Sequence, residues 1–135
     1  IGGQIQIGVG SGEKMVLVEL ANGMDNKVFT PQIGVGMSLS RPATGRAYLL
    51  GLPQAEREAY LHRLSERNPE RATLLGERLE DARRDLAEHG FCRSHGDLHR
   101  EILSIAVPMS QALDGEYWVF AAPRAASWKP TSARA

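Results

Sequence analysis

The middle of the chain carries two helix signatures with marked ends, and this block most constrains the fold. Asn68 and Pro69 suit the cap and the first turn of a helix, and Gly90 suits its end. An earlier helix is predicted to open at Pro53, where the chain is again followed by apolar residues at helical spacing. The positions on the two apolar faces are Ala55, Leu61 and Leu64, then Leu75, Leu79, Ala82 and Leu86.

Strand-like segments flank this helical block on both sides. They alternate or run apolar in lengths typical of strands, and glycine or asparagine residues separate them. With a further helix starting near Ala43, this order predicts one α+β domain in which an antiparallel sheet takes helices on one face. The predicted strands span residues 5–9, 15–20, 27–30, 33–37, 100–109 and 117–123.

The composition sets the size of the domain and argues against nucleic-acid binding. The chain has 135 residues, of which 42% are hydrophobic, enough for one domain with its own core. Lys and Arg number 16, and Asp and Glu number 16. The arginines of residues 56–88 alternate with acidic residues, which is typical of a solvated helix face, whereas phosphate binding draws on clustered basic residues.

The single cysteine and the lack of a long apolar run favour a location in the cytoplasm. Cys92 alone cannot form an internal disulfide, which fits a reducing cytoplasm. No apolar run approaches membrane-spanning length and no basic-then-apolar leader begins the chain, so we expect a cytoplasmic location and no membrane contact. Next to Phe91, Cys92 is more typical of a small strand residue than of a redox sensor, which needs an electropositive setting.

Residues 40–50 place small and hydroxyl-bearing side chains where an apolar helix begins. A helix start leaves backbone N–H groups unpaired and carries a partial positive charge, so it can bind a small anion. The candidate residues are Ser40, Ala43, Thr44 and Gly45. The alternative is an ordinary capped helix in which Gly45 serves close packing.

Catalytic and metal-binding alternatives have weaker signatures. The glycines of residues 8–12 precede a lysine, but a phosphate loop needs Ser or Thr next and then a helix. Ser40 or Ser104 could join a histidine in a hydrolase, yet the Gly-x-Ser-x-Gly elbow is missing. Imidazole and carboxylate groups near residue 95 could hold a divalent metal, although their spacing fits no standard pattern. We expect surface histidines in a polar turn, no metal, no cofactor and no enzyme activity. The possible metal ligands are His89, Cys92, His95, Asp97 and His99.

Two motifs at a set separation resemble one protein family. The helix start Ala-Thr-Gly-Arg-Ala at residues 43–47 is followed, two helices later, by the strand Ser-Ile-Ala-Val-Pro-Met at residues 104–109. This pairing resembles the effector-binding domain of IclR-type bacterial transcription regulators over residues 15–123. The resemblance implies a GAF-like sensor fold, with helices packed on the face of an antiparallel sheet.

The resemblance also implies partners. The DNA-binding part of this family is a separate N-terminal winged helix-turn-helix, which residues 1–135 do not contain. We therefore expect residues 1–135 to form a single effector-binding domain that binds a small organic acid and controls DNA binding by that other domain. A homodimer or homotetramer is expected. A GAF-like sensor coupled to another output, or a small-molecule enzyme, remains an alternative.

The family further implies which residues line the ligand pocket. One wall is the helix start with Ser40, Ala43, Thr44 and Gly45, and the far wall comes from the last strands. Some relatives carry serines on the final strand where this chain has apolar residues, which favours an aromatic or short-chain acid over one the size of glyoxylate. Plain packing is the alternative for each position. A further pocket residue, in the turn before these strands, is expected near Ser94, and the far-wall candidates are Leu103, Ser104, Val119 and Ala121.

Overall fold

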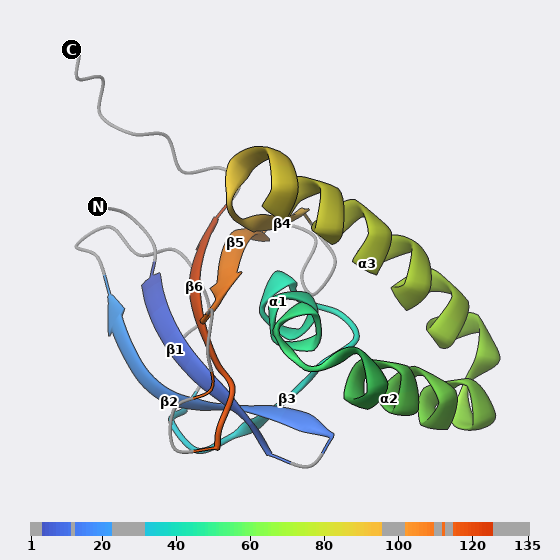
Figure 1. Ribbon diagram of the computed structural model, residues 1–135. Helices are drawn as coiled ribbons and strands as arrows, with labels where there is room; N and C mark the ends of the chain where they lie inside the picture. The colour runs from blue at the N-terminus through green and yellow to red at the C-terminus, as the bar shows by residue number, and fades with distance from the viewer. Residues whose placement is uncertain are drawn as a thin grey trace.

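The structure is a computed structural model that describes residues 4–11, 13–22, 32–95, 102–109, 112 and 115–125. Within these residues six strands form one antiparallel sheet, and three helices cover its concave face (Figure 1). The elements are β1 (Gln4–Ser11), β2 (Lys14–Asn22), β3 (Gly36–Ser38), α1 (Ala43–Gly51), α2 (Gln54–Arg67), α3 (Pro69–His89), β4 (Cys92–His95), β5 (Ile102–Pro108) and β6 (Trp118–Ala125). The predicted α+β arrangement is confirmed.

The sheet has the strand order β3-β2-β1-β6-β5-β4, so the first and last strands meet in its middle. Its pleat sorts the residues into two faces, because successive side chains point to opposite sides. Ala106 lies opposite both Cys92 and Ala121, and Gln6 also lies opposite Ala121. These four residues are buried and mark the inner face, which carries the helices. Large apolar residues of the outer face remain partly exposed, namely Ile5, Ile105, Val107 and Phe120.

Helix α3 begins and ends where the sequence predicts. The Asn68 side chain accepts a hydrogen bond from the backbone N–H of Arg71 at 3.1 Å, which is the usual cap. Gly90 ends the helix with φ at 83°, a left-handed conformation that glycine adopts without steric cost. The predicted apolar face of α3 is buried at Leu75, Leu79 and Ala82.

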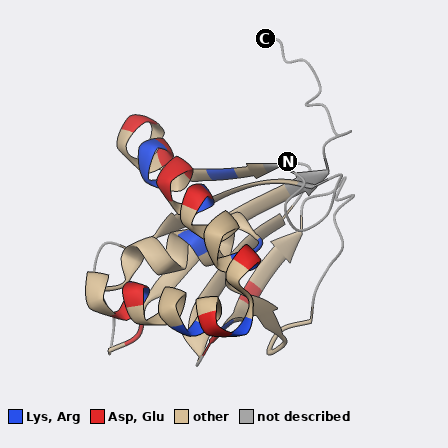
Figure 2. Ribbon diagram, turned by 90° about the vertical axis from the view of Figure 1, so that its right-hand side faces the viewer, with Lys and Arg blue, Asp and Glu red and all other residues tan. Residues whose placement is uncertain are grey.

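Charged side chains gather on α2 and α3, with both signs interleaved (Figure 2). Many pair with a neighbour one turn away, such as Arg83 with Glu80 at 3.5 Å and Arg84 with Asp81. This confirms the solvated helix face predicted from the charge pattern. None of the helices within the described ranges is both long and apolar enough to cross a membrane.

Two strands differ from the sequence prediction. β3 begins later than expected, because Gly34 occupies a turn with φ at 92° and donates its N–H to the Leu17 carbonyl at 2.8 Å. β4 forms where a polar turn was predicted, and it pairs antiparallel with β5. The predicted strand over residues 27–30 lies outside the described residues.

Helix α1 occupies the concave side of the sheet and forms the centre of the core. It packs mainly on β5 and β6, and also contacts β4 and α3. This position explains why most of its nine residues are buried. The core around it includes Met15, Leu39, Ala47, Leu49, Leu75, Leu79, Cys92, Ala106 and Val119.

Candidate functional site

The first turn of α1 is enclosed by the protein, and its backbone donors are unused among the described residues. Pro42 holds the N-cap position with extended backbone, and no side chain caps the helix. The Arg46 N–H donates to the Pro42 carbonyl at 3.3 Å, but the three amides before it, at residues 43–45, have no acceptor within the described part of the chain. Ala43 is 0% exposed and Thr44 5%. The side-chain cap of the alternative interpretation is therefore absent among the described residues.

These three amides make the helix start a candidate anion site. Buried N–H groups nearly always find an acceptor, and the helix dipole favours a negatively charged one. The Thr44 hydroxyl also has no hydrogen bond among the described residues. It can donate to or accept from a ligand at the same turn.

Ser40 lies just ahead of this turn and is bonded to Ser38. The two hydroxyl oxygens are 3.0 Å apart, and the Ser40 amide donates to the Ser38 hydroxyl at 3.1 Å. This pair fixes the loop between β3 and α1. Because a hydroxyl has one donor and two acceptor sites, half-buried Ser40 can still bond to a ligand.

Gly45 is required by packing, as the sequence alternative proposed. A Cβ atom added there would lie 2.2 Å from the Leu39 carbonyl oxygen, so no other residue fits unless the backbone moves. Helical periodicity puts Gly45 on the side of α1 that faces this loop, whereas Ala43 and Ala47 face the sheet. Gly45 can therefore offer a ligand its backbone N–H.

The direction of α1 is fixed by contacts along its length. A Cβ atom added to Gly51, the last residue of α1, would lie 3.0 Å from Pro108 at the end of β5. Nearer the helix start, the Arg46 guanidinium donates to the Arg93 carbonyl of β4 at 3.2 Å. The helix thus runs along β5 with its first turn towards the beginning of that strand, where Ser104 lies.

The inner face of the sheet is polar at this end. Ser94 and Ser104 lie opposite each other on β4 and β5, on the same face as Ala106. On β1, Gln4 and Gln6 are 3% and 7% exposed, and the Gln6 side-chain amide donates to the Gln4 side-chain oxygen at 2.7 Å. Buried amides and hydroxyls can hold a polar ligand. The sequence did not indicate the two glutamines as site residues, because polar residues of an alternating strand are expected on its solvent-exposed face.

The apolar far wall only partly matches the prediction. Val119 and Ala121 are buried on the inner face, but Val119 pairs with Pro108 and so lies nearer the end of α1 than its start. Leu103 precedes Ser104 and points to the opposite face with Ile105. The structure therefore places Leu103 away from the start of α1, contrary to the prediction.

Arg46 is a second residue that sequence reasoning missed. Its side chain is 3% exposed, and its guanidinium donates to the Arg41 carbonyl at 2.9 Å as well as to Arg93 in β4. These bonds hold the loop ahead of α1 against the sheet and bring a buried positive charge beside the helix start. The only sequence signal was an arginine within an otherwise apolar helix.

Cys92 and His89 do not assemble a reactive or metal-binding centre with other described residues. Cys92 is buried in β4, where burial raises the pKa of its thiol to about 11, which confirms a packed strand residue. His89 is exposed at the end of α3. Across the ranges that the structure describes, no group of His, Cys, Asp and Glu could hold a metal. Asp97 and His99 lie outside those ranges.

Comparisons with known proteins agree with this fold. The chain matches the family described as bacterial transcriptional regulator IclR, C-terminal, over residues 1–115. An IclR-family transcriptional regulator from Brucella abortus has a similar structure, with a TM-score of 0.82 and 30% identity over 91% of this chain and 46% of that chain. No curated protein sequence matches the chain.

More distant solved structures share the fold. The repressor BlcR of Agobacterium tumefaciens gives a TM-score of 0.67 at 19% identity, over 93% of this chain and 49% of that chain. A structure described as the effector domain of an IclR regulator from Acinetobacter gives 0.69 at 11% identity, over 92% of this chain and 73% of that chain. This chain spans about half the length of the Brucella and Agobacterium proteins. From the match over residues 1–115 and the fold, the chain belongs to the IclR C-terminal domain family of bacterial transcriptional regulators.

Proposed function

We propose that this domain binds a small organic anion at the start of α1 and thereby controls DNA binding by a separate domain of the same regulator. The observation that carries the proposal is the enclosed set of amides at residues 43–45, which have no acceptor among the described residues. A carboxylate at this position accepts their hydrogen bonds and gains from the helix dipole.

The surroundings of the helix start support a ligand with one charged end. The buried guanidinium of Arg46 adds positive charge beside the turn, and Thr44 and Ser104 offer hydroxyl groups. Ala121 supplies apolar surface on the inner face of the sheet. An aromatic or short-chain acid fits this combination better than an acid of glyoxylate size, because its body can bury apolar area.

The output of the domain follows from differential binding. A ligand that prefers one arrangement of the assembled regulator shifts its population by the difference in binding free energy, typically about 1–3 kcal/mol of coupling. A shift of α1 on ligand binding can move the elements that pack on this helix, namely β4, β5, β6 and α3. In this proposal the domain acts in the cytoplasm as a homodimer or homotetramer, needs no cofactor and catalyses no reaction.

DNA binding is proposed to reside outside this domain. The formal net charge of the chain is zero, and on α2 and α3 acidic and basic side chains alternate (Figure 2). A fragment of the regulator's own promoter should therefore bind to residues 1–135 no more tightly than about 10⁻⁴ to 10⁻⁶ M at physiological salt. Submicromolar, sequence-selective binding by residues 1–135 would contradict the proposal.

Calorimetric titration tests the acid site directly. Benzoate, hexanoate and glyoxylate are titrated against the protein, with the corresponding amides as controls. We expect benzoate and hexanoate to bind more tightly than glyoxylate, and the amides not to bind, because only a carboxylate is a charged acceptor. Equal binding of acids and amides would rule out the helix-start site.

Two threonine variants sharpen the test. Thr44→Val keeps the shape of the side chain but deletes a hydrogen bond to a charged group, so affinity should fall about ten- to hundredfold, equivalent to about 1.5–3 kcal/mol. Thr73→Val is the matched control, since Thr73 lies on the exposed side of α3 and its hydroxyl donates to the Pro69 carbonyl of the same helix. Unchanged affinity in Thr44→Val would remove this hydroxyl from the site.

A further inference from the structure

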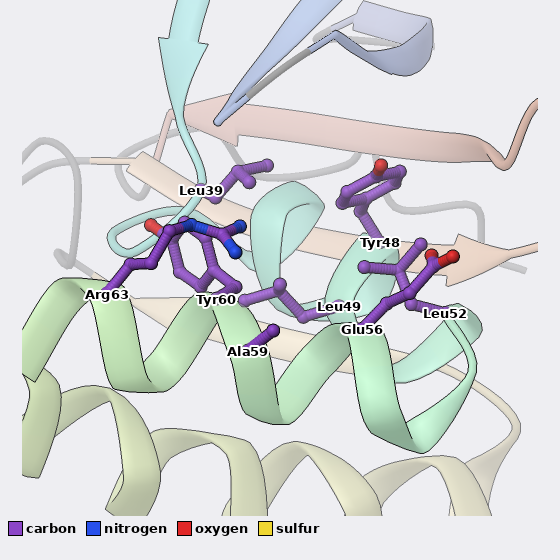
Figure 3. A pocket seen from close by; sticks show the side chains of 8 residues that line it. All are labelled: Leu39, Tyr48, Leu49, Leu52, Glu56, Ala59, Tyr60 and Arg63. Atoms are coloured by element: carbon purple, nitrogen blue, oxygen red, sulfur yellow. The ribbon is translucent and has the colours of Figure 1, made fainter.

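Helix α1 is held differently at its two ends. Its C-terminal end is held by α2, where the Arg57 guanidinium donates to the carbonyls of Leu49 and Leu52 at 3.4 and 3.2 Å. Leu49 and Ala59 of α2 also line one shallow hollow between the two helices (Figure 3). The first turn of α1 has no side-chain cap, so its position depends on the contacts of the loop ahead of it.

One of these contacts runs through the edge of the sheet. The Arg46 guanidinium donates to the Arg41 carbonyl of that loop at 2.9 Å and to the Arg93 carbonyl of β4 at 3.2 Å. β4 is an edge strand of four residues, and β5 is its one neighbour in the sheet among the described residues. The loop beside the acid site is therefore tied to a short strand that the sheet supports from one side.

Asp85 of α3 supports β4 from the other side. Its carboxylate accepts one hydrogen bond from the Arg93 backbone N–H at 3.2 Å and another from the Arg93 guanidinium at 2.7 Å. The guanidinium bond lowers the pKa of Asp85, so the carboxylate is charged at neutral pH. Because the side chain of Asp85 is only 14% exposed, water weakens these charge-assisted bonds less than those of a fully solvated pair.

We propose that Asp85 is a positioning residue for the acid site, which it supports through Arg93 and Arg46. Asp85 fixes Arg93 and thereby the carbonyl that Arg46 uses. Arg46 in turn holds the loop against the sheet and keeps the amides of residues 43–45 in the arrangement that a carboxylate needs. If the loop moves, only a fraction of the molecules has this arrangement, and the apparent affinity falls by that fraction. The inference rests on the proposed acid site and adds to it a residue that does not contact the ligand.

Calorimetric titration of Asp85→Ala with benzoate tests the positioning role. We expect binding about three- to tenfold weaker than in the unmodified protein, a range typical of residues that act through others. Loss of a negative charge would by itself strengthen the binding of an anion, so the sign of the change separates positioning from electrostatics.

Two further variants complete the series. Asp81→Ala is the matched control, because Asp81 lies one turn earlier on α3 and pairs with Arg84 of the same helix. It loses the same charge but leaves the bonds of Arg93 intact, so it should bind benzoate at least as tightly as the unmodified protein. Asp85→Asn keeps the shape of the side chain and can still accept from the Arg93 N–H, so its affinity should fall between those of Asp85→Ala and the unmodified protein.

Hydrogen exchange gives a second measurement, which a residue that only stabilises the fold would not affect. By linkage, benzoate should slow the exchange of the Arg93 backbone N–H by a factor comparable to the one by which Asp85 strengthens binding. The Leu20 N–H is the control, because it also donates to a carboxylate, that of Glu19 at 3.0 Å, but lies on β2. Its exchange should not change with benzoate.

The possible results separate this inference from the acid site. Weaker benzoate binding in Asp85→Ala, together with slower exchange at Arg93 in the unmodified protein, would support the positioning role. Benzoate that shifts the amide signals of residues 43–45 but binds Asp85→Ala as tightly as Asp81→Ala, or leaves the exchange of Arg93 unchanged, would overturn this role and leave the acid site standing. No saturable binding of benzoate to the unmodified protein would remove the acid site and the positioning role with it.

Discussion

The contact of Gly45 with the Leu39 backbone predicts a large loss of stability in Gly45→Ala. The added methyl group would lie 2.2 Å from the Leu39 carbonyl oxygen and 2.6 Å from both the Leu39 carbonyl carbon and Cα. All three atoms are backbone, so the loop or the helix has to move. Overpacking of this kind costs about 1–3 kcal/mol, and rigid backbone atoms favour the upper end. The better helix propensity of Ala offsets about 1 kcal/mol of this cost, so the free energy of unfolding should fall by about 2 kcal/mol.

Gly76→Ala is the matched control for this prediction. Gly76 also lies within a helix, but an added Cβ there meets no atom within 4 Å, so only the propensity gain of about 1 kcal/mol remains. Urea unfolding of both variants, with the denaturant slope checked for constancy, should move the midpoints in opposite directions. If Gly45→Ala were as stable as Gly76→Ala, the close approach of α1 to the Leu39 loop would be refuted.

Three further predictions concern Cys92, Asp85 and assembly. Because burial raises the pKa of the Cys92 thiol to about 11, iodoacetamide at neutral pH should modify it only on unfolding; rapid native-state labelling would contradict this. Arg93, bonded at 2.7 Å, lowers the pKa of Asp85, so Asp85→Asn should lose up to about 1 kcal/mol of unfolding free energy at neutral pH. That difference should vanish as the pH falls through the lowered pKa in the folded protein; a pH-independent loss would exclude the ion pair. Light scattering at tens of micromolar should report at least a dimer, and a monomeric mass would contradict self-association.

The order and type of the elements could be predicted because their signals are local. Asn68, Pro69 and Gly90 mark the ends of α3 through capping chemistry that acts within one turn. The strands β5 and β6 were long and apolar enough to be recognised within two residues of their ends. Element type and order depend on such short-range rules, so they follow from the sequence.

Which face of a strand turns inward could not be predicted so easily. The alternation in β1 identifies two faces, but the apolar one looks like the buried one. In the structure Gln4 and Gln6 point inward and Ile5 stays 48% exposed, because Gln6 lies opposite Ala121 on the face of the sheet that carries the helices. Beyond Cys92, β4 was predicted as a polar turn for a related reason, since Arg93, Ser94 and His95 show no apolar alternation.

The ligand-binding role of the candidate site stays a prediction, but the location of its residues can be compared with the structure. The sequence could predict a helix start around Thr44, because small residues at a helix start have a recognisable chemistry, and α1 does begin at Ala43. Arg46 could not be assigned, since its role depends on carbonyl groups of Arg41 and Arg93, the second of which is 47 residues away. Leu103 was misplaced by one position in a strand, which is enough to move a side chain to the other face.

Carboxylate binding to the amides at the start of α1 is the step on which the proposed function depends. Backbone amide NMR of the isotope-labelled protein tests it most directly, during titration with benzoate and, in a parallel sample, with benzamide. We predict saturable downfield shifts of the N–H signals of Ala43, Thr44 and Gly45 with the acid and none with the amide, because these donors have no acceptor among the described residues. Saturable benzoate binding that leaves these three signals unchanged, or equal shifts with benzamide, would contradict carboxylate binding at this turn.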